Sequence, residues 1–330
     1  MGVLALCGGS KAMRQGCSLL LDMGGTTTDM ALFVDGSPVV DRDGMRLEGR
    51  RTLVRALATV SIGVGGDSLI TVGEALGATA SARPVKVGPL REGPAMAFGG
   101  AQPTLLDALN VLNASAANGI NTDTVAGDVA ASESGIAALA ALHGLSAKEL
   151  AQLAADDALR QVAAAAQTLT ESVNARPIYT LAALKALREA RPTQAWLVGG
   201  PAPCVAQRLS QVLGMPVQTP PHADVANAVG AALTLPTDAV EVYADTGSGL
   251  LRAPALDLTE SIRKGCSLDA LGDRARELLL QRLEQAGAEG AAVEITEAES
   301  FATLDDNGFG SRDMRVVCQA VPGLAGLVSA

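Results

Sequence analysis

Aromatic residues are scarce in this sequence of 330 residues, which contains four Phe, two Tyr and one Trp. Because 48% of the residues are nevertheless hydrophobic, the core must consist mainly of Ala, Leu and Val. Small side chains of this kind fill a close-packed interior only when neighbouring helices approach one another closely. A chain of this length has enough material for one large domain or for two domains of ordinary size.

Basic residues are outnumbered, with 25 Lys and Arg against 35 Asp and Glu, which gives a formal net charge of −10. This charge excludes a general binder of nucleic acid or anionic membranes, whose surface is basic. The two histidines have no metal-ligand spacing, and the five cysteines form no C-x-x-C motif, so we expect reduced thiols. No apolar run approaches the roughly 18 residues of a membrane span, and we expect a cytoplasmic protein.

The most informative stretch is Leu19–Val34, in which two apolar segments flank a turn rich in glycine and threonine. Gly24 and Gly25 permit a tight turn, and the threonines that follow favour a strand and carry hydroxyl groups. Such a hairpin directs backbone N–H groups and hydroxyls toward one small volume, which suits an anion. Asp22, at the end of the first strand, can hold a hydrated Mg²⁺ beside a bound phosphate. The alternative is an ordinary hairpin with a Gly-Gly turn.

Two further glycine-rich turns follow predicted strands. One is Ser61–Ser68, before a strand predicted at Leu69–Val72, and the other is Gly199–Pro203, after a buried strand predicted at Gln194–Val198. No G-x-G-x-x-G opens a helix and no G-x-x-x-x-G-K-[ST] occurs, which excludes the Rossmann and Walker A designs. The Gly- and Pro-rich segment Arg83–Ala101 is predicted to be an ordered surface loop.

The clearest helical pattern begins at Ser146, where Glu149 completes a capping box and apolar residues recur to about Val173. Thr104 is a plausible N-cap of an earlier helix, and His143 is expected at a helix end. Further helices are predicted at Gly135–His143, Tyr179–Glu189, Cys204–Leu213 and Ala223–Leu233. Their alternation with strands, including Pro216–Thr219, indicates a mostly parallel sheet with helices on its faces.

A domain boundary is predicted near Leu235, which divides the chain into residues 1–235 and 236–330. The second part has predicted strands and one amphipathic helix, and it carries no evident chemical motif. We interpret it as a small α+β domain with a packing or assembly role. Its predicted elements are strands at Ala239–Ala244, Gly249–Arg252, Ala292–Ile295 and Met314–Ala320, and a helix at Leu268–Gln285.

The order of the motifs resembles that of the hydantoinase A/oxoprolinase family. The matching segments are Asp22–Asp29, Ser61–Ser68, Val87–Pro89, Gly93–Ala95, Pro103–Asp107, Val198–Ala202 and Ala226–Ala232. The resemblance implies an α/β fold, with an actin/sugar-kinase-like (ribonuclease H-like) ATPase lobe followed by a small α+β domain. It also implies the use of ATP to activate a cyclic amide or carboxylate for ring opening or carboxylation. Family members commonly act with a hydantoinase B-type partner subunit or domain.

The resemblance assigns roles to individual residues. Asp22 would assist Mg²⁺ and water, and Asp22 and Asp67 are the candidate catalytic residues. The turn would hold the β- and γ-phosphates of ATP through N–H groups and hydroxyls, and the Gly199–Gly200 turn would line the adenosine. The second glycine turn would face the substrate or the γ-phosphate, its alternative being a structural loop. The candidate cofactor-binding residues are Gly24, Gly25, Thr26, Thr27, Thr28, Gly65, Gly66, Gly199 and Gly200.

Family members normally carry two Asp-x-Gly-Gly hairpins, whereas residues 1–17 contain no aspartate. We therefore expect the N-terminal lobe of the family to be missing. The alternatives are a split subunit, a fragment, a lineage that lost catalysis, or a site that another chain completes. One hypothesis is a subunit of an ATP-dependent hydrolase that acts on a small cyclic amide of the hydantoin or 5-oxoproline type. The other is a nucleotide-binding regulatory or reactivase-like module with little catalysis of its own.

Overall fold

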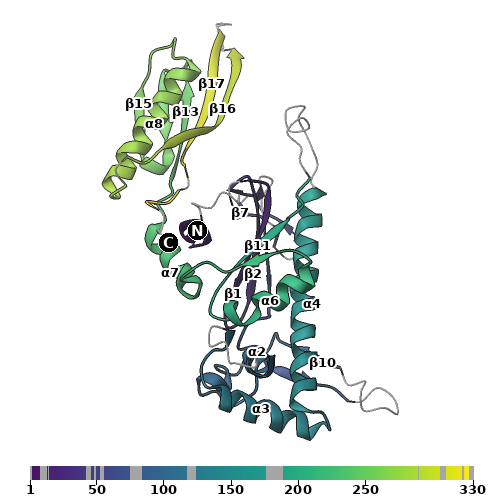
Figure 1. Ribbon diagram of the computed structural model, residues 1–330. Helices are drawn as coiled ribbons and strands as arrows, with labels where there is room; N and C mark the ends of the chain where they lie inside the picture. The colour runs from purple at the N-terminus through teal and green to yellow at the C-terminus, as the bar shows by residue number, and fades with distance from the viewer. Residues whose placement is uncertain are drawn as a thin grey trace. The chain divides into compact units, whose positions relative to one another are not determined.

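The computed structural model describes residues 2–7, 13, 15–41, 46–47, 50–52, 56–74, 84–116, 124–175, 189–288, 290–304, 310–321 and 323–326. These residues form two compact units, the first reaching Ala231 and the second covering Ala232–Gly326 (Figure 1). The helix predicted at Tyr179–Glu189 lies outside the described residues except for Glu189, which is not helical. Across the described ranges, no helix is both long enough and apolar enough to cross a membrane.

A six-stranded mixed sheet forms the centre of the first unit. The hairpin predicted from the sequence is confirmed: β1 (Cys17–Met23) and β2 (Thr28–Val34) pair antiparallel, with Asp22 opposite Asp29. The strand β11 (Gln194–Val198) is also confirmed, and it runs parallel to β1. The strand order is β12-β11-β1-β2-β3 with β8 beside β2, where the remaining strands are β3 (Ser37–Pro38), β8 (Thr59–Ile62) and β12 (Val217–Gln218).

The two faces of this sheet pack against different partners, because successive side chains of a strand point to opposite faces. Leu19, Leu21 and Met23 of β1 join the main core beneath the helices on one face. On the other face, Phe33 and Trp196 belong to a smaller cluster with residues of the short helix α1. The helices named here are α1 (Gly2–Cys7) and, in the main core, α2 (Leu105–Ala116), α4 (Ala147–Asn174) and α6 (Ala202–Leu213).

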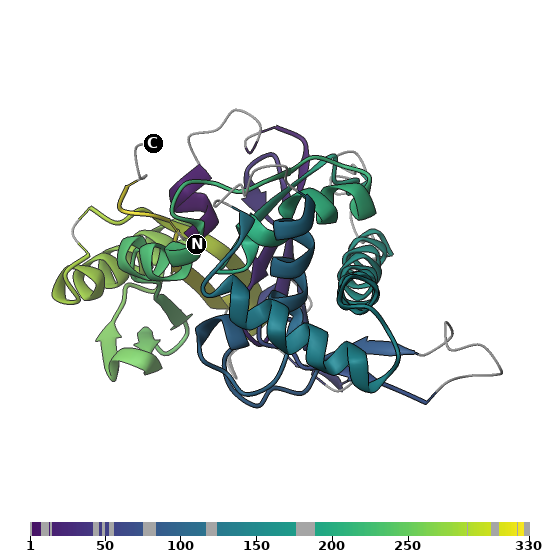
Figure 2. The same cartoon turned by 60° about the horizontal axis from the view of Figure 1, so that its bottom comes forward.

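The long helix α4 begins where the sequence predicts, because Ser146 and Glu149 form a complete capping box. The helix α3 (Val129–Leu142) is longer than the predicted Gly135–His143, and Asp128 caps its first turn. His143 ends α3, as expected. The sequence of α3 is rich in Ala on all sides, so it lacks the apolar period that marks α4. Figure 2 shows α3 in front of the sheet, where it packs against α2 and α4.

The segment predicted as the loop Arg83–Ala101 contains two regular elements. β10 (Val85–Val87) pairs antiparallel with β9 (Ile70–Val72), the strand predicted at Leu69–Val72, and η2 (Met96–Phe98) is a 3₁₀ turn. The loop prediction was therefore wrong for these residues, because the Val-Lys-Val alternation of β10 is too short to mark a strand. Other elements are β4 (Val40–Asp41), β5 (Arg46–Leu47), β6 (Arg50–Arg51), β7 (Ala56–Leu57), η4 (Ala223–Val225) and α7 (Ala226–Leu233).

The second unit is an antiparallel sheet with the helix α8 (Leu268–Gln285) on one face. Buried residues such as Val242, Val316 and Leu279 form the core between them. On the opposite face, Arg315 joins the strands through ion pairs with acidic side chains. The strand order is β15-β14-β13-β17-β16, with bounds β13 (Ala239–Asp245), β14 (Leu250–Ala253), β15 (Leu258–Ser261), β16 (Val293–Leu304) and β17 (Gly310–Ala320), and the 3₁₀ turn η5 is Pro254–Leu256.

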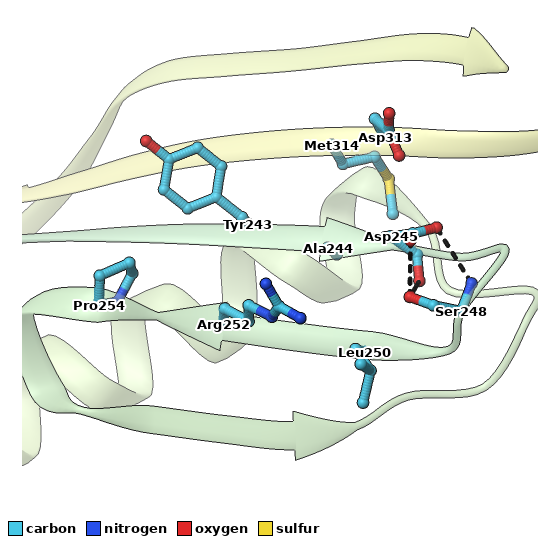
Figure 3. A pocket seen from close by; sticks show the side chains of 9 residues that line it. All are labelled: Tyr243, Ala244, Asp245, Ser248, Leu250, Arg252, Pro254, Asp313 and Met314. Carbon is cyan, nitrogen blue, oxygen red and sulfur yellow. Dashed lines mark hydrogen bonds between the residues drawn. The ribbon is translucent and has the colours of Figure 1, made fainter.

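A hollow of about 540 Å³ lies over β13, β14 and the adjoining strand β17 (Figure 3). One of its polar groups is Asp245, whose carboxylate accepts hydrogen bonds from the Ser248 hydroxyl and from the N–H of Gly247. These bonds hold the pKa of Asp245 below its ordinary value, because they favour the charged form. Asp245 therefore stabilises the turn that follows it by accepting hydrogen bonds from Gly247 and Ser248.

All five cysteines are free, in agreement with the prediction of reduced thiols. Burial raises the pKa of the Cys204 thiol to about 11 and that of Cys7 to about 12. Both side chains thus stay protonated at neutral pH, and a protonated thiol is a poor nucleophile. These two cysteines serve as small apolar core residues.

Candidate functional site

The three glycine turns predicted from the sequence lie together at one edge of the sheet. Because β1 and β11 are parallel neighbours with Asp22 beside Val198, the turns that follow them emerge at the same edge. Gly199 has a positive φ of 104°, and a Cβ at this position would overlap the carbonyl oxygen of Met23. Only glycine fits this close approach between the end of β1 and the end of β11.

The second glycine turn is bonded directly to the first. The N–H of Gly66 donates to the carbonyl of Gly24 at 2.9 Å, and the N–H of Asp67 donates to the carbonyl of Gly25 at 2.7 Å. A Cβ on Gly65 would lie 2.6 Å from backbone atoms of Gly25. The third turn joins the same cluster, since a Cβ on Gly66 would lie 2.7 Å from the Pro201 ring.

These contacts use the carbonyl groups of the first turn and leave several of its N–H groups without a partner among the described residues. The carbonyls of Gly24 and Gly25 accept from the second turn, whereas the N–H groups of Gly25, Thr26 and Thr27 donate to no residue that the structure describes. Consecutive free N–H groups in a turn attract an anion, because their partial positive charges add. The turn therefore has the donor arrangement of an anion site.

The three threonines have different surroundings. Thr26 is exposed, and the hydroxyl of Thr27 donates to Asp29 at 3.3 Å. Thr28 is fully buried, and its hydroxyl donates to the carbonyl of Val64 at 2.6 Å. The hydroxyl of Thr28 thus holds the two turns together, which leaves Thr26 as the threonine whose hydroxyl makes no bond within the described part of the chain.

Two carboxylates flank the turn, and they differ in their hydrogen-bond partners. Asp22 is partly buried at the end of β1, and no described residue forms a hydrogen bond or ion pair with its side chain. Asp67 is held on both oxygens: Oδ1 accepts from the N–H of Ala95 at 3.0 Å, and Oδ2 accepts from Nη2 of Arg91 at 2.8 Å. Asp22 is therefore available to a cation, whereas Asp67 already has partners. Within the described ranges, no cluster of three His, Cys, Asp or Glu side chains forms a metal site.

The environment of Gly200 differs from that of Gly199. Gly200 is exposed, and a Cβ built on it would meet nothing within 4 Å. The N–H of Gly199, in contrast, donates to the carbonyl of Ala223 at 2.8 Å, which fixes the start of the turn. The backbone of the third turn is therefore exposed at Gly200, beside the other two turns.

Sequence reasoning missed two residues that build this site. Arg91 lies in the Gly- and Pro-rich segment, 24 positions from its partner Asp67, so that no local pattern connects them. The sequence singles out Asp107 only as the last residue of the Pro103–Asp107 motif, although its buried carboxylate accepts five hydrogen bonds. The signals for Asp107 are its place in the first turn of α2, where an acidic residue is favoured, and its position three residues after Thr104, the spacing of a capping box.

Gly65→Ala is expected to destabilise the first unit by about 2 kcal/mol, because the added methyl group forces backbone atoms apart. Gly24→Ala is the matched control: its Cβ would lie 3.7 Å from the carbonyl oxygen of Thr27, which is an ordinary contact. Urea unfolding followed by the fluorescence of Trp196, the single tryptophan, reports on this unit. Equal midpoints for the two variants would contradict the close packing of the turns.

Comparisons with solved structures show the fold. Acetone carboxylase, in a nucleotide-free structure, aligns with 98% of this chain and 49% of its own at 16% identity, with a TM-score of 0.57. The ATP-dependent caprolactamase from Pseudomonas jessenii aligns with 97% of this chain and 48% of its own at 16% identity, with a TM-score of 0.51. The chain therefore spans about half the length of these structures. A comparison with curated proteins gives no match.

The α/β fold class predicted from the sequence, with a small α+β domain after the larger unit, is confirmed. The sequence model of the hydantoinase/oxoprolinase family matches residues 2–239, well over half of the chain and all three glycine turns. The chain belongs to the hydantoinase/oxoprolinase family.

Proposed function

We propose that the Asp22–Asp29 hairpin binds Mg-ATP and that the chain is a subunit of an ATP-dependent hydrolase of cyclic amides, of the hydantoin or 5-oxoproline type. The observation that carries the proposal is the set of free N–H groups on Gly25, Thr26 and Thr27, beside a carboxylate without a partner among the described residues. Phosphate oxygens match such donors, and Mg²⁺ is usually held by one or two carboxylates together with phosphates.

Each group has a role in this proposal. The free N–H groups of the turn and the Thr26 hydroxyl hold the β- and γ-phosphates, where negative charge develops in phosphoryl transfer. Asp22 holds Mg²⁺ and water, and Gly199 and Gly200 line the adenosine. When bound, ATP supplies a phosphoryl group that activates an amide or carboxylate oxygen.

The second glycine turn supports the first in this proposal. Gly65 and Gly66 bring its backbone against the phosphate-binding turn, which keeps the donors in place before any ligand arrives. Asp67 stays a candidate catalytic residue, although its Oδ2 must first be released by Arg91. Residues 1–235 form the nucleotide-binding domain, and residues 236–330 form a domain for packing or assembly.

One of the two solved relatives supports the substrate class, and both support the use of ATP. Caprolactam is a cyclic amide, and the caprolactamase with this fold is ATP-dependent. Acetone carboxylation by the other relative is also ATP-dependent. A hydantoinase B-type subunit, or a chain that supplies a second phosphate hairpin, is the partner we propose.

A second candidate function is a nucleotide-binding regulatory or reactivase-like module. The observation that favours it is the Asp67 carboxylate, whose two oxygens are both engaged by Arg91 and Ala95. Such a module would bind ATP in the same turn and would turn it over slowly.

ATPase measurements with and without hydantoin or 5-oxoproline separate the two functions. We expect hydrolysis of ATP to rise when the cyclic amide is added, for the chain alone or with a co-purified partner. ATP binding without stimulated turnover, with any partner, would contradict the hydrolase and favour the regulatory module.

A further inference from the structure

Arg91 brings a positive charge to the edge of the proposed phosphate-binding turn. Its Nη2 lies 2.8 Å from Oδ2 of Asp67 and 3.9 Å from the position that a Cβ on Gly25 would occupy. That same Cβ would overlap the Asp67 carboxylate, so only a glycine lets this ion pair lie against the turn. The guanidinium group is thus adjacent to the turn in which the N–H groups of Gly25, Thr26 and Thr27 donate to no described residue.

The carboxylate of this ion pair is fixed, whereas the cation can move. Asp67 is bonded to the turn through its own N–H and to Ala95 through Oδ1, and its side chain is only 15% exposed. The Arg91 side chain is 44% exposed, and its long flexible stem can reorient in solvent. Because the Arg91 side chain is already 44% exposed, water can solvate its guanidinium group when it leaves Asp67.

A fixed carboxylate beside a phosphate site creates an electrostatic conflict. A negative charge on Asp67 repels a phosphate held by the N–H groups of Gly25 and Thr26, unless a cation lies between them. Arginine suits this position, because its planar guanidinium group forms two parallel hydrogen bonds to a phosphate and keeps its charge at every physiological pH.

We propose that Arg91 is a specificity-determining residue, which exchanges the Asp67 carboxylate for the terminal phosphoryl group of the nucleotide. The proposal rests on the function proposed above and adds to it a means of distinguishing a triphosphate from a monophosphate. Arg91 contributes to binding only when a phosphoryl group extends as far as its guanidinium group. The exchange also releases Oδ2 of Asp67 toward the reacting end of the site.

A simpler role for Arg91 is to neutralise Asp67 without contacting the ligand. The two roles differ in the double variant Arg91→Ala/Asp67→Asn. If Arg91 only neutralises Asp67, removing the carboxylate as well restores affinity. If Arg91 binds the phosphoryl group, affinity stays low even without the carboxylate. The Asp67→Asn variant keeps an amide oxygen that can accept the N–H of Ala95, which preserves the loop.

The experiment is isothermal titration of the intact chain with ATP, ADP and AMP in the presence of Mg²⁺. We expect Arg91→Ala to weaken ATP binding about tenfold or more and AMP binding less than about twofold. We expect the double variant to bind ATP about tenfold more weakly than Asp67→Asn alone. An unchanged ratio of ATP to AMP affinity in Arg91→Ala, or full recovery in the double variant, would overturn the proposal.

Lys86→Ala is the control, since it removes an exposed cation from the same segment at a position paired with β9. It should leave all three affinities unchanged. If the unmodified chain binds no nucleotide, the proposed function fails and the role of Arg91 fails with it. If the unmodified chain binds ATP and Arg91→Ala binds it equally well, only the role of Arg91 is lost. Circular dichroism of each variant establishes that the fold is retained.

Discussion

Asp107→Ala is expected to lower the free energy of unfolding of the first unit by about 4 kcal/mol or more. The Asp107 side chain is fully buried, and no ion pair with it is found among the described residues. Its carboxylate is therefore stabilised by hydrogen-bond donors alone. The donors are the N–H groups of Met96, Ala97 and Thr104 and the hydroxyls of Thr104 and Ser132, at 2.7–3.0 Å. Alanine leaves these buried donors without an acceptor, and each then loses its solvation without compensation.

Asp128→Ala is the matched control for this prediction. Asp128 is exposed and caps α3 through one hydrogen bond from the N–H of Ala131, so its loss should cost only about 1 kcal/mol. Urea titrations of both variants, followed through Trp196, give the comparison. A cost for Asp107→Ala that does not exceed the cost for Asp128→Ala would show that the buried carboxylate is not the organising group of this region.

The position of Asp107 connects stability to the site. Its carboxylate fixes the N–H groups of Met96 and Ala97, and the adjacent N–H of Ala95 donates to Asp67. The loop that carries Arg91 is therefore tied, at the adjacent residues Ala95, Met96 and Ala97, both to the second glycine turn and to the start of α2. Sequence changes at Asp107 should disturb ligand binding even though this residue does not reach the turn.

Local patterns were sufficient to predict the hairpin and the elements beside it. The apolar runs on both sides of Gly24 and Gly25 specify two strands, and the capping box at Ser146 specifies the start of α4. The strand Gln194–Val198 followed by Gly199 predicts a turn at the carboxyl end of a parallel strand. Parallel neighbours end at the same edge, so the meeting of the turns also follows from the topology.

The remaining features depend on contacts that are distant in sequence. The bonds from Gly66 to Gly24 and from Arg91 to Asp67 join segments that no spacing rule connects. The burial of the Thr28 hydroxyl against Val64 is equally invisible in a run of three threonines. A sequence pattern therefore identifies which residues can bind an anion, whereas tertiary packing decides which of their polar groups remain free.

Removal of both polar side chains of the turn, in Asp22→Ala/Thr26→Ala, is expected to weaken the binding of Mg-ATP about a hundredfold. Asp22 would hold the metal ion, and the Thr26 hydroxyl would donate to a phosphate, so that two charge-assisted contacts are lost together. The fold should be unaffected, because neither side chain bonds to another described residue. The backbone N–H groups remain and retain a weak affinity for phosphate.

Asp245→Ala/Ser248→Ala provides the control, since it removes the same two chemical groups from a turn of the second unit (Figure 3). Its effect on unfolding should be confined to that unit, and nucleotide binding should stay at the level of the unmodified chain. Comparison of the two double variants separates the loss of a ligand contact from the loss of a carboxylate and a hydroxyl in general.

Isothermal titration of the unmodified chain and of Asp22→Ala/Thr26→Ala with ATP and Mg²⁺ tests the central claim most directly. The claim is that the hairpin at Asp22–Asp29 is a nucleotide-binding site. It predicts saturable binding by the unmodified chain and by the control variant, and a loss of about a hundredfold in affinity for the turn variant. Equal affinity in all three proteins, or no binding by the unmodified chain, would contradict it.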